Sequence, residues 1–387
     1  PGRAGCYLLS RENKGVEVKL ADKHSQRSAN RVRERGKLST KRKVANVIIV
    51  VFSLIFGLTG GVMVYAYGLL NNMYRPLSGD ATINSNASAP LGESDVEGYV
   101  SGAVESLAAQ STVGEDELAS DDGVFNVLLV GSEAYGNSDT MILLSLDEVH
   151  QKLKMTSFLR DTWVAIPGLQ DNRLNAAYSY GGTELAIETI ERNFGVNIDK
   201  YARVDFDMFK SIVEILGGVE ITITDEEAEY LNEFARHSPT LPGAGTYILT
   251  PEQALEHVRN RTSGSWYDFG RTERQRNFLT SLIERFKGAN IAQMGSVLVE
   301  CLQHVETDIP LNQMSFLLQN ADKYLNYEVE QYTVPATGSY TPQDIYRGGY
   351  TMNVLVLDDM EQTREDLKEF IYGDTGGLDS TSSSFRE

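Results

Sequence analysis

Apolar runs and alternating apolar and polar residues divide much of this chain into strands and helices. Residues 124–130 and 141–146 are apolar runs of strand length, and residues 153–158 alternate with the period of two expected of a strand. Apolar residues at three- and four-residue spacing predict helices instead. The remaining strands are predicted at 201–206, 219–223, 327–334 and 352–357, and the helices at 183–194, 207–216, 271–287, 291–304, 311–324 and 360–372.

A further helix start is marked around residue 250. Thr250 has the side chain of an N-cap, Pro251 suits the first helical position, and Gln253 completes a capping box. Strands interleaved with helices predict an α/β fold of α-β-α layers, with a central mixed β-sheet flanked by helices. Residues 124–372 are long enough to form one large core, so we interpret them as one folded domain.

One segment is too apolar for the surface of a soluble domain. Residues 44–74 contain no charged side chain, whereas about 20 apolar residues suffice to cross a bilayer. A buried core helix would be shorter, and no A-x-A cleavage site of a signal peptide follows. We therefore predict that residues 44–72 form a single transmembrane helix, an uncleaved signal anchor.

Charge is distributed unevenly on the two sides of this segment. Residues 1–43 carry 13 basic and 4 acidic side chains, so they are predicted to be a disordered cytoplasmic tail. Residues 73–123 have one Arg against ten acids and are predicted to be an extended extracellular linker. Residues 373–387 are predicted to be a disordered tail. The protein is thus expected in the cell membrane with its folded domain outside, and a net charge of −19 argues against nucleic acid as a partner.

The clearest candidate for chemistry is a cluster of arginines. Common catalytic patterns such as G-x-S-x-G and H-E-x-x-H are absent from the sequence, but five Arg and no Lys occur between residues 259 and 276. An Arg guanidinium binds phosphate oxygens in a bidentate way, which a Lys ammonium cannot do. Surface ion pairs are the alternative, but the clustering favours phosphate binding. The cluster comprises Arg259 and Arg261, two residues apart, and Arg271, Arg274 and Arg276, with Gln275 expected on the helix face of Arg271 and Arg274.

Two loops after predicted strands add further candidates. Glu133 and Asp139 follow the first strand, and their carboxylates could hold Mg²⁺ together with phosphate oxygens, although a simple turn would use similar residues. Arg160 follows the strand at 153–158 and could either reach a phosphate or pair with Asp161. Loops at the carboxyl ends of strands are where α/β sheets bind ligands.

Together these residues make the chain resemble the LytR-CpsA-Psr family of cell-wall glycopolymer ligases. The matching segments extend in order from residue 126 to residue 275. They include NVLLVG at 126–131, SDTM at 138–141, LRDT at 159–162, LNAAYSYGG at 174–182, LTPEQALEHV at 249–258 and DFGRTERQ at 268–275.

The resemblance implies a membrane-anchored, magnesium-dependent phosphotransferase with residues 124–372 as its catalytic domain. It would move a glycopolymer, such as a teichoic acid or capsular polysaccharide, from undecaprenyl pyrophosphate to a peptidoglycan acceptor. Position by position, it implies pyrophosphate binding by Arg160, Arg259, Arg261, Arg271 and Gln275, catalytic roles for Asp139, Arg160 and Arg271, and Mg²⁺ binding by Asp139 and Glu133. Glu133 stands where the family usually has Asp, and Asn137 where it usually has Arg.

Two other functions stay open on the sequence alone. A polyprenyl-pyrophosphate phosphatase would use the same groups with water as the acceptor. A non-catalytic scaffold or regulator of wall assembly would bind the lipid carrier without turnover.

Overall fold

The computed structural model describes most of the chain beyond the predicted membrane segment. The described residues are Gly68 and 73–78, 112–114, 117–132, 138–261, 267–347 and 349–373. The predicted span at 44–72 lies outside them apart from Gly68, as does the tail at 1–43. Within the described ranges, no helix is both long and apolar enough to cross a membrane.

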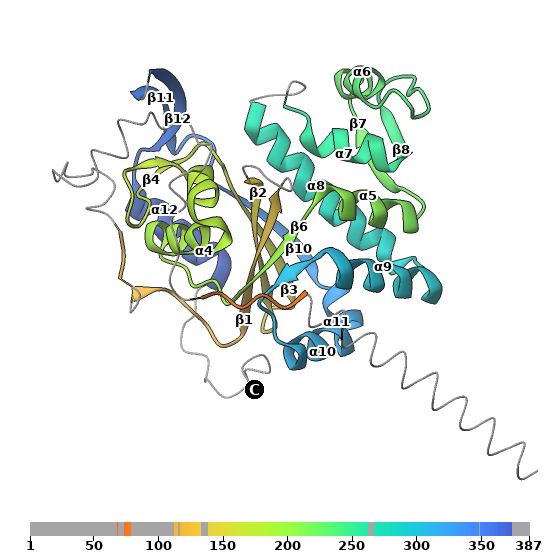
Figure 1. Cartoon of the computed structure of the whole chain (residues 1–387), viewed down its shortest axis with the longest axis horizontal. Helices are drawn as coiled ribbons and strands as arrows, with labels where there is room; N and C mark the ends of the chain where they lie inside the picture. The colour runs from red at the N-terminus through yellow and green to blue at the C-terminus, as the bar shows by residue number, and fades with distance from the viewer. Residues whose placement is uncertain are drawn as a thin grey trace, which may run out of the picture. The chain divides into compact units, whose positions relative to one another are not determined.

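A six-stranded mixed sheet forms the centre of the fold (Figure 1). Its strands follow the order β10-β3-β2-β1-β6-β9. The pairs β10–β3 and β1–β6 are parallel, and the other neighbours are antiparallel, which confirms the predicted mixed sheet. The strands are β1 (Val124–Ser132), β2 (Ser138–Asp147), β3 (Lys152–Phe158), β6 (Lys200–Val204), β9 (Glu306–Thr307) and β10 (Glu328–Val334).

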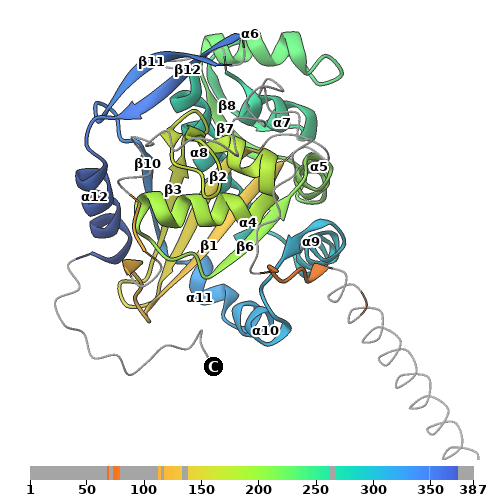
Figure 2. The ribbon, with the colours of Figure 1, turned by 60° about the vertical axis from the view of Figure 1, so that its left-hand side comes forward.

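Two helices, α4 (Leu174–Phe194) and α12 (Met360–Tyr372), cover one face of the sheet (Figures 1 and 2). Their apolar side chains form a core with alternate residues of β1 and β2. Helix α4 is kinked at Gly181 and Gly182, and Gly182 has a φ of 64°, a backbone conformation that glycine adopts without a steric penalty.

The other face of the sheet is covered by α5 (Phe206–Ile215), α7 (Pro251–Arg259) and α8 (Tyr267–Lys287), with α9 (Ile291–His304) packed on α5 (Figure 1). Helices α5, α7 and α8 share a second core with α6 (Asp225–Phe234) and with a two-stranded sheet of β7 (Val219–Ile223) and β8 (Gly245–Leu249). The remaining elements are β4 (Trp163–Val164), β5 (Asn172–Arg173), α10 (Leu311–Gln319), α11 (Ala321–Leu325), β11 (Tyr340–Arg347) and β12 (Tyr350–Leu357).

Most predicted elements are present, but several boundaries were wrong. The helix predicted at 183–194 begins at Leu174, and the helix predicted at 271–287 begins at Tyr267. The strand predicted at 201–206 ends at Val204, because Asp205 caps α5 by accepting a hydrogen bond at 2.8 Å from the backbone N–H of Met208. The helix predicted at 311–324 is divided into α10 and α11 at Asn320. The capping box of Thr250 and Gln253 is confirmed.

Parts of the predicted linker contact the folded domain. Ala119 forms a bridge with Val196, and its backbone N–H donates to the carbonyl of Gly195 at 3.0 Å. Arg75 donates its backbone N–H to the carbonyl of Thr307 in β9 at 2.7 Å. The predicted domain boundary at residue 124 therefore falls inside the packed part of the chain.

Candidate functional site

The predicted site residues that the structure describes lie along one edge of the central sheet. Strands β1, β3, β6 and β10 end at this edge and β2 begins there, because β2 is antiparallel to β1 and β3. Gly131 at the end of β1 pairs with Thr140 at the start of β2. Arg160 follows β3 at the same edge, so the topology brings together loops that are distant in sequence.

A cavity of about 710 Å³ opens between this part of the sheet and helices α5, α7 and α8. Leu129, Gly131, Thr140 and Ile142 form its floor. A Cβ at Gly131 would lie 3.0 Å from the Cβ of Thr140, so a side chain there would crowd the floor. Helix α6 contributes Tyr230 and Phe234 to the rim.

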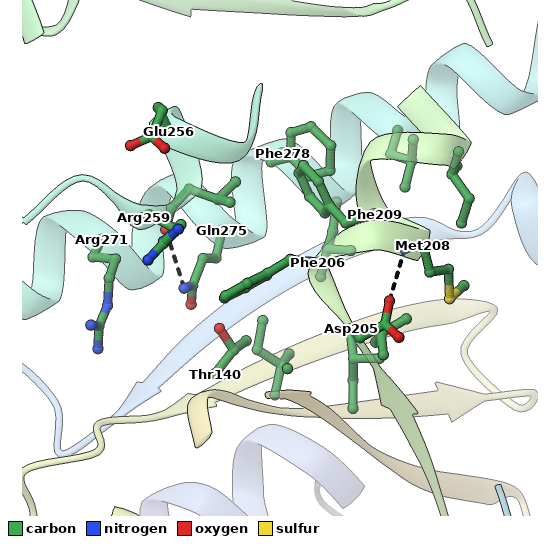
Figure 3. Close-up of a pocket in the computed structure, with 18 of the residues that line it drawn as sticks. Thr140, Asp205, Phe206, Met208, Phe209, Glu256, Arg259, Arg271, Gln275 and Phe278 are labelled. Atoms are coloured by element: carbon green, nitrogen blue, oxygen red, sulfur yellow. Dashed lines mark hydrogen bonds between the residues drawn. The ribbon is translucent and has the colours of Figure 1, made fainter. Parts of the chain in front are cut away.

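Most of the cavity wall is apolar. Phe209 of α5 faces Phe278 of α8, with the two ring centroids 4.6 Å apart, and Phe206 of α5 also lines the cavity (Figure 3). Ile212 and Leu282 extend this lining along the two helices. An apolar cavity of this size suits a hydrocarbon chain better than a sugar or a nucleotide, because it offers few hydrogen-bonding groups along its length.

One end of the cavity is cationic. Arg259, Arg261 and Arg271 line it together with Gln275, and Figure 3 shows Arg259, Arg271 and Gln275 side by side. The guanidinium of Arg259 lies 4.9 Å from the centroid of the Phe206 ring, a cation–π contact. Gln275 Nε2 donates to the carbonyl of Val258 at 3.3 Å, which fixes the amide relative to α7. The structure therefore gathers four of the five predicted pyrophosphate ligands.

Two arginines of the cluster serve the packing instead. Arg274 pairs with Glu227 of α6, with Nη1 3.3 Å from Oε1, and donates to the carbonyl of Asn260. Burial lowers the pKa of Arg274, although the Glu227 carboxylate opposes this shift. Arg276 Nε donates to Oε1 of Gln331 in β10 at 3.0 Å.

The predicted common face of Arg271, Arg274 and Gln275 was therefore wrong for Arg274. Each helical residue turns by about 100°, so Arg274 and Gln275 lie on opposite sides of Arg271. Gln275 lies on the cavity side, and Arg274 lies on the side of α6.

Arg160 is outside the cavity lining. Its Nε lies 3.2 Å from Oδ2 of Asp161, whose other oxygen is 3.2 Å from Nη1 of Arg173. Of the two alternatives for Arg160, the structure thus shows the pair with Asp161. Its predicted contact with a phosphate stays a prediction.

The predicted magnesium ligands lie largely beyond what the structure describes. Glu133 and Asn137 fall outside the described residues, and of Asp139 the backbone alone is described, in β2 next to Thr140. Within the described ranges, no group of three or more His, Cys, Asp or Glu side chains could hold a metal ion. Magnesium binding therefore stays a prediction.

The apolar lining was not predicted, although its pattern is present in the sequence. On α8, the polar residues Arg271 and Gln275 continue into Phe278, Leu279 and Leu282 at helical spacing, so one face changes from cationic to apolar. On α5, Phe206, Phe209 and Ile212 recur every three residues. A phosphate site that continues into an apolar face is what a lipid phosphate would need.

Comparisons with known proteins agree with this arrangement. The LytR_cpsA_psr family model matches residues 95–369, so the chain belongs to this family.

Three relatives illustrate the match. The polyisoprenyl-teichoic acid–peptidoglycan teichoic acid transferase TagV of Bacillus subtilis (strain 168) is 32% identical over 262 residues, which cover 64% of each chain. TagU of Oceanobacillus iheyensis, a transferase of the same description, is 32% identical over 216 residues, 53% of this chain and 65% of the relative. The chain thus matches slightly less than two thirds of the length of these relatives. The solved structure of TagT bound to LI-WTA aligns with a TM-score of 0.54 and 25% identity, over 69% of this chain and 99% of TagT.

Proposed function

We propose that this protein is a membrane-anchored phosphotransferase that moves a glycopolymer from a polyprenyl pyrophosphate carrier to peptidoglycan. The observation that carries the proposal is the cavity, whose apolar length ends at Arg259, Arg261, Arg271 and Gln275. The carrier has the same two parts, a long hydrocarbon chain and a dianionic pyrophosphate group. The names of TagV and TagU as teichoic acid transferases support a teichoic-acid-like polymer.

The arginines would hold the pyrophosphate and stabilise its charge during transfer. Phosphoryl transfer depends mainly on positioning and charge stabilisation and needs no covalent nucleophile from the protein. An acceptor hydroxyl attacks the phosphorus that carries the glycopolymer, and a new O–P bond forms. The phosphoanhydride bond breaks and polyprenyl monophosphate leaves, while Asp139 is the candidate to take the hydroxyl proton.

Mg²⁺ belongs to this proposal as the cofactor. Asp139 and Glu133 would hold it, since carboxylate oxygens are the protein ligands that magnesium prefers. When bound, it would neutralise part of the negative charge on the phosphates. Arg160, at the same edge of the sheet, would exchange its pair with Asp161 for a phosphate oxygen. Residues 44–72 would anchor the chain, with the catalytic domain outside the cell.

The direct test uses the full chain in lipid nanodiscs, a polyprenyl-pyrophosphate-linked saccharide and a peptidoglycan oligomer. We expect saccharide to be joined to the oligomer through a phosphodiester, with release of polyprenyl monophosphate. EDTA should abolish the reaction, and added Mg²⁺ should restore it.

The same assay separates the two alternative functions. Release of lipid monophosphate and saccharide phosphate at an equal rate without the oligomer would indicate a phosphatase. Tight binding of the donor with no product under either condition would indicate a scaffold, and either result would overturn the proposed transfer.

A further inference from the structure

The segment that follows the predicted membrane span, residues 73–78, is held directly on the folded domain. Besides the bond from Arg75 to Thr307, the hydroxyl of Tyr201 donates to the carbonyl of Arg75 at 2.8 Å, and Tyr74 forms a bridge with Thr307. Arg75 is three residues beyond the predicted span, a distance of at most about 10 Å along an extended chain. The surface around Thr307 must therefore lie close to the bilayer if residues 44–72 span it.

Thr307 lies between the end of α9 and the start of α10, so these two helices flank the attachment point. Figure 2 shows the segment 73–78 beside α9. The two helices together contain 23 residues, and Glu300 is the sole Asp, Glu, Lys or Arg in their sequences. In a chain with 54 acidic residues, this is an unusually uncharged surface.

The same helices expose large apolar side chains. Leu298 and Val299 of α9 are 38% and 41% exposed, and Leu311 and Leu318 of α10 are 42% and 50% exposed. No residue of α10 is buried, although five of its nine side chains are Leu, Met or Phe. Tyr74 and Leu77, next to the predicted span, are each 38% exposed. Several large apolar side chains exposed around one attachment point are typical of a contact with a partner or a membrane.

The opposite end of the domain has the reverse composition. Helix α6 has five acidic residues among its ten and lies at the top of both ribbon views, whereas α9 and α10 lie in the lower half (Figures 1 and 2). The phospholipids of bacterial membranes include anionic ones, which would repel α6 and would not repel α9 and α10. The charge distribution therefore agrees with the position of the attachment point.

We propose that the outer faces of α9 and α10, with Tyr74 and Leu77, rest on the lipid bilayer. This membrane-contact face consists of Tyr74, Leu77, Leu298, Val299, Leu311 and Leu318. It orients the domain with α6 away from the membrane, and it converts residues 73–78 from a spacer into a rigid connection.

The orientation also places the apolar part of the cavity near the bilayer. The use of this position rests on the proposed function. Ile212, in the apolar lining, is one turn from Ile215, whose carbonyl accepts a hydrogen bond at 3.0 Å from Nε2 of Gln293 in α9. The apolar part of the cavity is thus adjacent to the helix that contacts the bilayer. A polyprenyl chain would move from the membrane to the cavity over a short distance.

The test measures lipid contact in the full chain without any substrate, so its result is independent of the proposed enzyme activity. Cys6→Ser and Cys301→Ser remove the native thiols, and single cysteines are then introduced by Val299→Cys, Leu318→Cys, Ile248→Cys and Tyr346→Cys. Ile248 and Tyr346 are matched controls, 58% and 74% exposed, on β8 and β11 away from the attachment point. Each variant is spin-labelled in nanodiscs of phosphatidylcholine and phosphatidylglycerol.

We expect labels at positions 299 and 318 to collide with lipid-soluble oxygen several-fold more, relative to a water-soluble nickel chelate, than labels at 248 and 346. Equal ratios at all four positions would overturn the proposal. Labels at 299 and 318 shielded from both reagents would also overturn it, since they would show that a protein partner, such as a second copy of the chain, covers the face.

Discussion

The two faces of the central sheet use neighbouring residues of the same strands for different purposes. Leu128 and Val130 of β1 point toward α4 and α12 and are fully buried. Leu129 lies between these two residues and Gly131 follows them, and both belong to the floor of the cavity. The face toward α4 is filled, with Phe158 and Phe194 rings 5.2 Å apart, whereas the face toward α8 contains about 710 Å³ of open space.

This difference indicates a division of labour. A close-packed face stabilises the domain through burial and dispersion contacts. An open apolar face contributes less to stability and leaves surface for a ligand. Strand alternation allows both within one sheet, so mutations on adjacent residues should separate stability from function.

The largest expected effect is on activity at the cationic end of the cavity. Arg271→Ala should lower phosphotransfer by about 100-fold or more, because one charge-stabilising donor contributes this much in comparable sites. Arg271→Lys should recover only part of the phosphotransfer rate, since a Lys ammonium cannot bind two phosphate oxygens in a bidentate way. Initial rates at saturating donor measure the effect, with thermal unfolding recorded for each variant.

Arg285→Ala is the matched control, because Arg285 lies on the same helix and donates to the carbonyl of Leu216 away from the cavity. It should keep near-normal activity. Arg160→Ala tests the remaining predicted ligand in the same assay. A loss below tenfold for Arg160→Ala or Arg271→Ala would contradict that residue's assignment to the active site.

The next effect separates the two faces directly. Leu128→Ala should lower the free energy of unfolding by about 3 kcal/mol, since it leaves a cavity in a packed core. Leu129→Ala, one residue further along β1, should cost about 1 kcal/mol or less, because its side chain already borders open space. Urea unfolding monitored by circular dichroism gives both values.

Binding of a fluorescent polyprenyl pyrophosphate should show the opposite order. Leu129→Ala should weaken it, and Leu128→Ala should leave it unchanged in the folded protein. Equal destabilisation by the two substitutions would mean that the second face is as tightly packed as the first.

A smaller effect on the free energy of unfolding is expected when the pH is lowered, because of His257 in α7. Burial next to the Arg274 guanidinium lowers the pKa of His257 to about 3. The unfolded chain, with an ordinary His pKa near 6.5, then binds a proton that the folded chain does not between these pH values. The contribution of His257 to the free energy of unfolding is complete above pH 6.5. It is lost as the pH falls, by about 2 kcal/mol at pH 5.

Comparison with His257→Gln isolates this contribution, because the carboxylates of the chain titrate in both proteins. The difference in unfolding free energy between wild type and variant should shrink from pH 7 to pH 5. A pH-independent difference for His257→Gln would contradict the buried neutral histidine.

The smallest effect concerns the helix that carries Arg259. Thr250→Ala removes the side chain that caps α7 and should cost about 1 kcal/mol. Thr250→Ser should restore most of it. Because α7 belongs to the cavity side, hydrogen exchange should increase in α7 and not in α4, and a uniform increase would argue against independent behaviour of the two faces.

Local patterns in the sequence were enough for much of the fold. The apolar runs of β1 and β2, the alternation of β3 and the capping box of α7 depend on near neighbours, so they could be predicted. Helix α6 and strands β8 and β11 were not predicted. Helix α6 is acidic, with only three buried residues, and β11 is largely exposed, so hydrophobic periodicity gave little signal there.

The sequence by itself determined which residues are chemically able to bind a phosphate, because the clustering of Arg without Lys is visible in one dimension. It also predicted the membrane segment, from the length of an uncharged apolar run. Tertiary structure alone decided how the cluster divides, with Arg259, Arg261 and Arg271 at the cavity and Arg274 and Arg276 in contacts with Glu227 and Gln331. The physical reason is that periodicity tells which residues share a helix face, whereas the partner of each face depends on helices and strands that are distant in sequence.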